Sequence, residues 1–346
     1  MAKYRVALSG DFKKPDGSPS YPMFDLTPLT GDKDIEVRFV EPVDGTMPAS
    51  GLEGCDALIL LVPKFGPSSV PKDGKLAVVA RFGVGYDTVD LPTCNANGIA
   101  LCITPDGVRR PVAVAIITFM LALSQKMLVK DKITREGPSG WAKRSEHMGR
   151  GLVGRTLGQL GIGNIGAEVF RLAKPFDLKL IAHDPYVDPK VAAGLGVELV
   201  GLEDLFRRAD FLSVSVPLSD ATRHIVNAER LALMRPTSYI INTSRGPTID
   251  QKALYQALTT GKIAGAGLDV FDIEPCPADE PILKLDNVIC APHSLCWTDE
   301  CFAANGAADI VHVKEALAGR LPRSIVNREV VDNPTFKAKL AALAKR

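Results

Sequence analysis

The 346-residue chain has almost no excess charge, because 41 Lys and Arg residues stand against 40 Asp and Glu residues, for a net charge of +1. This balance gives no support for binding to nucleic acid or to an anionic membrane surface, which depends on clustered positive charge. The longest apolar run, residues 112–123, is shorter than a bilayer-spanning helix requires. The N-terminal lysine is followed by no long apolar segment, so we expect a cytoplasmic protein without a membrane partner.

Cysteine pairs with metal-site spacing are also missing. Seven cysteines are scattered along the chain, and the closest set, Cys290, Cys296 and Cys301, lacks the C-x-x-C spacing of zinc sites. We therefore expect reduced thiols and no metal. The glycosylation acceptor pattern at residues 242–244 follows a strand that looks buried, so we do not expect it to be modified.

The chain is long and apolar enough for two cores, with 46% hydrophobic and 23% charged residues. Short apolar runs alternate with helical stretches, a pattern typical of α/β proteins whose parallel sheets are covered by helices. The expected strands fall into two sets. The first comprises residues 5–9, 35–40, 57–62, 76–80 and 99–103, and the second comprises 157–160, 178–182, 211–216, 238–241, 264–268 and 288–290.

A glycine fingerprint opens the second set. Gly161, Gly163 and Gly166 form G-x-G-x-x-G between a strand and a helical pattern, which permits a tight turn, close approach of a pyrophosphate and close helix packing. Asp184 ends the next strand, eighteen residues after Gly166, where a carboxylate binds a ribose 2′-hydroxyl and repels a 2′-phosphate. These features predict a bound dinucleotide, with NAD favoured over NADP.

Five side chains capable of chemistry follow the strands of this second set. They are Asp184, Arg245, Asp269, Glu274 and His293. Ligands of open α/β sheets bind at the carboxyl ends of the strands, so we expect these residues to converge although more than a hundred positions separate them.

Five ordered motifs give the chain a resemblance to the D-isomer-specific 2-hydroxyacid dehydrogenase family. They are RFGVGYDTVD at 81–90, VPLSDATRHIVN at 216–227, INTSRGPTID ending at 250, GLDVFDIEPCPADEP at 267–281 and APHSLCWT at 291–298. The resemblance implies two Rossmann-like, doubly wound parallel-sheet domains with the active site in the cleft between them. Residues 1–103 and 296–346 would form a flavodoxin-like substrate-binding domain, and residues 104–295 the NAD-binding domain. It also implies a homodimer, with residues 112–128 and 137–151 as candidate contacts.

The resemblance implies that Arg245, Glu274 and His293 are catalytic in an NAD-dependent oxidoreductase. The guanidinium of Arg245 is permanently charged and its planar fork matches a substrate carboxylate. A histidine has an ordinary pKa of about 6.5, so His293 can give and take a proton near neutral pH. A carboxylate at Glu274 would fix the tautomer of that imidazole and favour its charged form.

The resemblance also assigns binding residues. For the cofactor they are Gly161, Gly163, Asn164, Ile165, Gly166, Asp184, Val216, Pro217, Thr222, Thr243, Ser244, Arg245 and Asp269, the last beside the nicotinamide carboxamide. For the substrate they are Lys64, Val84, Gly85, Arg245, His293 and Trp297. Val84 and Gly85 would offer backbone N–H groups to the substrate carboxylate, and Trp297 would wall the side-chain pocket.

The sequence departs from the family pattern at two positions, so the resemblance does not identify the substrate. Val114 stands where the family commonly has an acidic residue, and bulky Trp297 stands among residues that are usually small. The substrate could therefore resemble that of glyoxylate or hydroxypyruvate reductases, of phosphoglycerate dehydrogenases, or of D-lactate dehydrogenase-like enzymes that take a bulkier 2-oxo acid. A non-enzymatic NAD-sensing corepressor remains an alternative, whereas Glu274 disfavours a formate dehydrogenase, which would carry glutamine there.

Overall fold

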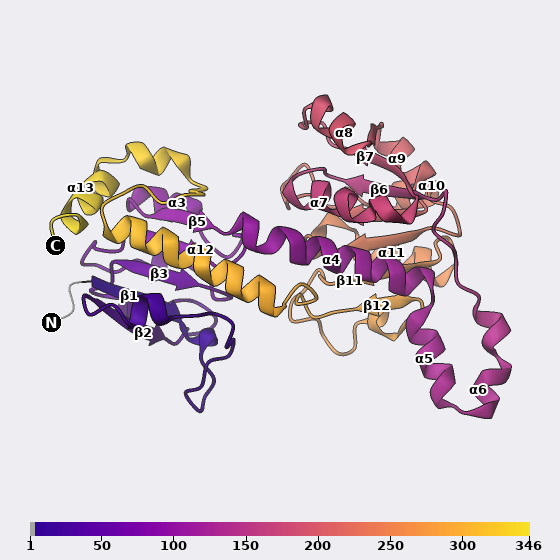
Figure 1. Cartoon of the computed structure of the whole chain (residues 1–346), viewed down its shortest axis with the longest axis horizontal. Coiled ribbons are helices and arrows are strands. Elements are labelled where there is room, and N and C mark those ends of the chain that lie inside the picture. The colour runs from indigo at the N-terminus through magenta and orange to yellow at the C-terminus, as the bar shows by residue number, and fades with distance from the viewer. Residues whose placement is uncertain (1–3) are drawn as a thin grey trace. The chain divides into compact units, whose positions relative to one another are not determined.

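The computed structural model describes residues 4–346, which form two compact units (Figure 1). The first unit runs to Val108 and resumes at Thr298–Arg346, and the second is Arg109–Trp297. The expected boundaries lay at 103/104 and 295/296. The first lies later in the structure because Gly107 packs against Asn305 of the first unit, where an added Cβ would come within 2.8 Å of the Asn305 backbone nitrogen.

The first unit contains a five-stranded parallel sheet with the order β2-β1-β3-β4-β5, which is the flavodoxin-like order. Its strands are β1 (Tyr4–Ser9), β2 (Ile35–Val40), β3 (Ala57–Leu60), β4 (Val78–Arg81) and β5 (Ala100–Ile103). The central strand β3 is buried along its whole length, as expected for a parallel strand covered on both faces.

Within residues 4–346, five α-helices belong wholly to the first unit. They are α1 (Thr27–Thr30), α2 (Ala49–Leu52), α3 (Leu91–Ala96), α12 (Asp299–Leu317) and α13 (Pro334–Leu343). The long helix α12 packs on β3, β4 and β5 (Figure 1). Thr298 caps it by accepting a hydrogen bond from the Cys301 N–H, which satisfies one of the orphan donors of its first turn.

The second unit contains a seven-stranded parallel sheet with the order β12-β11-β10-β9-β6-β7-β8. Its strands are β6 (Thr156–Leu160), β7 (Lys179–His183), β8 (Glu198–Leu199), β9 (Phe211–Val214), β10 (Tyr239–Asn242), β11 (Gly265–Leu268) and β12 (Val288–Cys290). The sequence indicates the other six strands but not β8, which is only two residues long. The chain order reverses between β6 and β9, and that switch point is where dinucleotides bind in such sheets.

The remaining α-helices lie in the second unit, except that the first of them begins in the first unit. They are α4 (Pro105–Ser124), α5 (Met127–Arg135), α6 (Pro138–Ala142), α7 (Asn164–Ala173), α8 (Pro189–Leu195), α9 (Leu202–Arg208), α10 (Ala228–Leu233) and α11 (Gln251–Thr259). Helix α4 has 20 residues, more than the apolar run suggests, and by length and composition alone it could cross a membrane. However, 61% of its most apolar stretch is buried within the protein, so it is a core helix.

Gly267 of β11 brings α4 close to the sheet. A Cβ at this glycine would lie 2.7 Å from the Phe119 ring, and Phe119 is 2% exposed. We predict that Gly267→Ala lowers the free energy of unfolding by about 1–3 kcal/mol through overpacking, measured as a lower midpoint of thermal denaturation. Gly194→Ala in α8 is the matched control, because its added Cβ meets no atom within 4 Å. Equal midpoints for the two variants would contradict this account.

Candidate active site

The glycine turn after β6 has the geometry that its fingerprint predicts. Gly161 has φ +90°, and a Cβ there would lie 2.8 Å from the Ser215 carbonyl oxygen. A Cβ at Gly166 would lie 2.4 Å from the Gly161 carbonyl oxygen, so this residue allows α7 to approach the turn. A Cβ at Gly163 would meet no protein atom within 4 Å, and no side chain caps the N-terminus of α7. The turn therefore presents open backbone and helix N–H groups that suit a pyrophosphate.

Asp184 supports this turn directly. Its Oδ2 accepts a hydrogen bond of 2.9 Å from the Ile162 N–H, and its Oδ1 accepts one of 2.9 Å from the Tyr186 N–H. An ionised carboxylate has about four acceptor positions, so two remain for ribose hydroxyls. The residues present therefore fit a dinucleotide, because Asp184 holds the glycine turn and retains acceptor positions that suit ribose hydroxyls.

The other expected cofactor residues follow the neighbouring strands. Asn164 and Ile165 form the first turn of α7, and Thr243 and Ser244 follow β10. Val216, Pro217 and Thr222 belong to the loop after β9, where Thr222 Oγ1 donates to the Pro217 carbonyl at 2.6 Å and accepts from the Ser219 N–H at 2.8 Å. The loop is thus closed on itself by one hydroxyl group.

Arg245 lies in a turn organised by Asn242, which is 1% exposed. Asn242 Oδ1 accepts hydrogen bonds from the N–H and the hydroxyl of Ser244, at 3.0 and 2.8 Å, while its Nδ2 donates to the Arg245 carbonyl at 3.0 Å. Thr248 Oγ1 donates to the same carbonyl at 2.7 Å. The Arg245 backbone is therefore fixed on both sides, and its Nη1 donates to the Ser244 carbonyl at 2.7 Å.

Gly246 brings the arginine turn against the segment that carries Glu274. A Cβ at Gly246 would lie 1.9 Å from the Phe271 carbonyl oxygen and 2.0 Å from its carbon, so only glycine fits there. Phe271 in turn donates its N–H to Glu274 Oε1 at 3.0 Å. Two turns that follow different strands are thereby held in contact.

Glu274 and His293 form a close pair. His293 Nδ1 lies 2.7 Å from Glu274 Oε2. Burial raises the pKa of Glu274, but the hydrogen bond and charge of His293, the Phe271 N–H and the charge of Arg245 together bring that pKa below its ordinary value. Because an ionised carboxylate only accepts, Nδ1 carries the proton in this contact, which leaves Nε2 as the nitrogen that can exchange a proton with a substrate.

Asp269 secures the loop that holds His293. His293 has φ +55°, a left-handed conformation that is uncommon for a residue with a side chain. Asp269 Oδ1 accepts hydrogen bonds from the N–H groups of Ser294 at 2.9 Å and Leu295 at 3.2 Å. The carboxylate is 3% exposed, and burial raises its pKa. These two bonds hold the residues after His293 and compensate for its unfavourable backbone conformation.

Trp297 also belongs to the second unit, where its N–H donates to the Ser294 carbonyl at 2.8 Å and its side chain is 42% exposed. Lys64, Val84 and Gly85 belong to the first unit. Lys64 is exposed and its backbone is bonded to Gly45 and Met47. Within residues 4–346, the backbone N–H groups of Val84 and Gly85 donate to no other residue.

The second unit thus brings Arg245, Glu274, Asp269 and His293 to one edge of its sheet, whereas Lys64, Val84 and Gly85 stand on the first unit. Asn242 is not among the site residues expected from the sequence, where it stands out only as part of a glycosylation acceptor pattern. An asparagine at the end of a buried strand and just before an arginine turn was the available signal.

Comparisons with known proteins show which family the chain is similar to. The sequence model of the D-isomer specific 2-hydroxyacid dehydrogenase NAD-binding domain matches residues 117–294. The chain is 40% identical over 297 residues to a D-3-phosphoglycerate dehydrogenase of Methanocaldococcus jannaschii, covering 84% of this chain and 56% of that relative. It is 39% identical over 285 residues to a glyoxylate reductase of Korarchaeum cryptofilum, covering 81% and 85% of the two chains.

Among solved structures, the chain resembles an NADPH-dependent glyoxylate/hydroxypyruvate reductase of Sinorhizobium meliloti in complex with NADP and malonate. The TM-score is 0.79 at 27% identity, and the match covers 94% of this chain and 98% of that one. These findings confirm the expected two-domain fold, the use of a nicotinamide dinucleotide and the oxidoreductase class. The chain belongs to the D-isomer specific 2-hydroxyacid dehydrogenase family.

Proposed function

We propose that the chain is an NAD-dependent dehydrogenase that interconverts a D-2-hydroxy acid and its 2-oxo acid, with His293 as the general acid and base. The observation that carries the proposal is the 2.7 Å contact between His293 Nδ1 and Glu274 Oε2. The charge of Arg245 also lowers the pKa of Glu274. The names of the relatives, glyoxylate reductase and D-3-phosphoglycerate dehydrogenase, support a small 2-oxo acid as substrate.

Arg245, Glu274 and His293 have separate roles in the proposed reaction. The nicotinamide, when bound, supplies or accepts the hydride. In reduction, Arg245 binds the carboxylate and carbonyl oxygen of the 2-oxo acid, and protonated His293 donates from Nε2 to the oxygen that gains charge. Glu274 holds Nδ1–H and stabilises the imidazolium. In oxidation, neutral His293 removes the hydroxyl proton through the same nitrogen.

Residues of the first unit complete the proposal. The N–H groups of Val84 and Gly85 would bind the substrate carboxylate, and the exposed Lys64 would pair with an anionic or hydroxyl-rich tail. Trp297 would limit the size of the substrate side chain. Seven cysteines without a disulfide are in keeping with the reducing cytoplasm that we propose as the location.

We predict that the purified protein oxidises NADH in the presence of at least one of glyoxylate, hydroxypyruvate, pyruvate, phenylpyruvate, 2-ketogluconate and 3-phosphohydroxypyruvate. His293→Ala should lower kcat about 10²–10⁴-fold, because the proton donor is lost. The measurement is the steady-state rate of absorbance loss at the NADH band.

His147→Ala is the control, since this half-buried histidine lies in the 3-10 turn Arg144–His147, outside the site. Wild-type turnover in His293→Ala would contradict the proposed role. If the wild-type protein binds NADH but oxidises it with none of the six acids, the NADH-sensing alternative would be favoured.

We propose that NADH is preferred over NADPH, although the Sinorhizobium meliloti reductase is NADPH-dependent. The negative charge of Asp184 beside the ribose position carries this proposal. Asp184→Asn should reduce the ratio of kcat/KM for NADH to that for NADPH by about tenfold, because the repulsion of a 2′-phosphate is removed. Asp188→Asn is the control, because Asp188 is a nearby carboxylate that caps α8. An unchanged ratio in Asp184→Asn would be evidence against the proposal.

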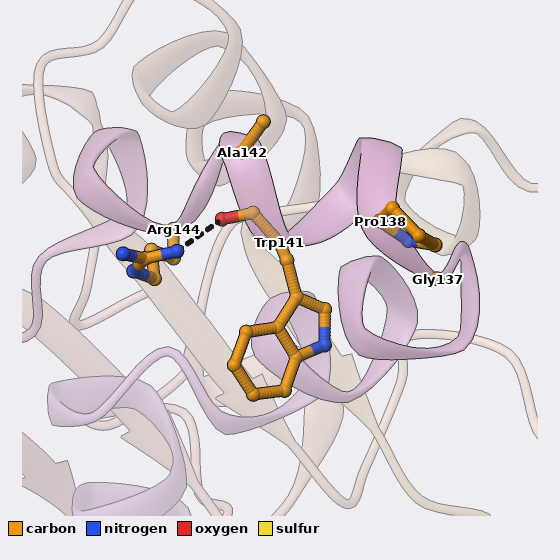
Figure 2. Close-up of a pocket in the computed structure, with 5 residues that line it drawn as sticks. All are labelled: Gly137, Pro138, Trp141, Ala142 and Arg144. Carbon is orange, nitrogen blue, oxygen red and sulfur yellow. Dashed lines mark hydrogen bonds between the residues drawn. The ribbon is translucent and has the colours of Figure 1, made fainter.

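We further propose a homodimer formed through the segment around α5 and α6, which extends away from the seven-stranded sheet (Figure 1). Met127, Leu128, Trp141 and Met148 are all more than half exposed in it. Figure 2 shows Trp141 at a surface hollow that it lines with Gly137, Pro138, Ala142 and Arg144. A concentration of exposed apolar side chains of this kind is typical of an interface.

Trp141→Glu should therefore shift the protein from dimer to monomer in sedimentation equilibrium, because a charge would be buried at the contact. Val43→Glu is the control, since Val43 is 60% exposed in the first unit, away from this segment. A wild-type protein that remains a monomer at all concentrations would exclude the dimer.

A further inference from the structure

A buried chain of polar groups holds the loop that follows β4. The Gly83 N–H donates to Thr104 Oγ1 at 2.8 Å, Thr104 Oγ1 donates to Asn305 Oδ1 at 2.6 Å, and Asn305 Nδ2 donates to Cys301 Sγ at 3.3 Å. Thr104 and Asn305 are 1% and 2% exposed. This series of hydrogen bonds connects residues more than two hundred positions apart in the sequence, and all of them belong to the first unit.

The donor and the acceptor of each hydrogen bond in this series are fixed by the chemistry of the groups. The Gly83 N–H can only donate, so it must use the acceptor side of the Thr104 hydroxyl group. The hydroxyl hydrogen is then left to donate to Asn305, which must present its carbonyl oxygen rather than its amide nitrogen. Helix α12 therefore supplies a fixed acceptor to the hydroxyl on which the loop depends.

Thr104 also binds the other side of Gly83, because the Thr104 N–H donates to the Gly83 carbonyl at 2.9 Å. A trans peptide unit is planar, with its C=O and the following N–H pointing in opposite directions. Since the Gly83 carbonyl points at Thr104, the Val84 N–H in the same unit points away from Thr104. The two bonds to Thr104 thus decide where the Val84 donor is aimed.

The conformation at Gly83 depends on this support. Gly83 has φ +118°, which is rare for any residue with a side chain, and a Cβ there would collide with the Arg81 guanidinium. Asn305 is itself confined, because Gly107 at the start of α4 packs against its backbone and side chain. Neither end of the chain can therefore shift without moving the loop.

We infer that Thr104 and Asn305 are positioning residues that aim the Val84 N–H at the carboxylate of the substrate. This inference rests on the proposed function, in which Val84 and Gly85 receive that carboxylate. Neither side chain touches the substrate: Thr104 acts through the Gly83–Val84 peptide unit, and Asn305 acts through Thr104. They therefore affect affinity for the acid and leave binding of the dinucleotide unchanged.

The test compares Thr104→Val, which keeps the shape but loses the hydroxyl, with Thr104→Ser, which restores it. We expect Thr104→Val to raise KM for the best 2-oxo acid and the dissociation constant of oxalate, a carboxylate probe, by about tenfold or more. The dissociation constant of NADH should stay unchanged, and Thr104→Ser should recover most of the oxalate affinity. Thr259→Val is the control, because this exposed hydroxyl bonds to the Tyr255 and Gln256 carbonyls of its own helix, α11.

A lower melting temperature in Thr104→Val with unchanged KM and oxalate affinity would overturn the inference, because it would show a structural role alone. Hydrogen exchange of the wild-type peptide containing Val84, with NADH and with or without oxalate, provides a readout that needs no variant. Slower exchange with oxalate is expected, and equal exchange would overturn the inference. A wild-type protein that neither reduces any 2-oxo acid nor binds oxalate would instead overturn the proposed function as well.

Discussion

The hydrogen bond between His293 and Glu274 is the constraint on which the rest of the site depends, because the two residues follow different strands and must meet at 2.7 Å. Each partner is also fixed by a hydrogen bond to a neighbouring residue or to the adjoining backbone. Phe271 donates to the second oxygen of Glu274, and Asp269 binds the backbone just after His293. Gly246 then joins the arginine turn to the same segment. Three turns of one sheet edge are thereby made into a single rigid arrangement.

Much of this arrangement could be predicted from the sequence, because its signals are local. Gly161 has a positive φ that the turn requires, and Gly166 approaches the Gly161 carbonyl within the same β-turn-α unit, so the glycine spacing alone indicates their position. The long buried strands are visible as apolar runs for the same reason. The convergence of Arg245 and His293 follows from one further rule, that the carboxyl ends of parallel strands share an edge.

What could not be predicted depends on contacts between distant segments or on very short elements. Strand β8 has two residues and no periodicity to detect. Asn242 matters because its amide bonds to Ser244 and to the Arg245 carbonyl, and its place at the end of a buried strand is only a weak sequence signal of those contacts. The bond between Thr104 and Asn305 spans two hundred positions. For the same reason the start of α4, which packs on Asn305 through Gly107, belongs to the first unit rather than the second.

Asp184 also bears on how cofactor choice can evolve. Its carboxylate is bonded to the Ile162 N–H inside the glycine turn, in addition to the ribose contact that we propose. Asparagine at this position would remove the charge and keep one acceptor oxygen for Ile162. A cation in place of Asp184, in contrast, would leave the Ile162 N–H without this partner, so that route to a 2′-phosphate requires a second change that restores an acceptor.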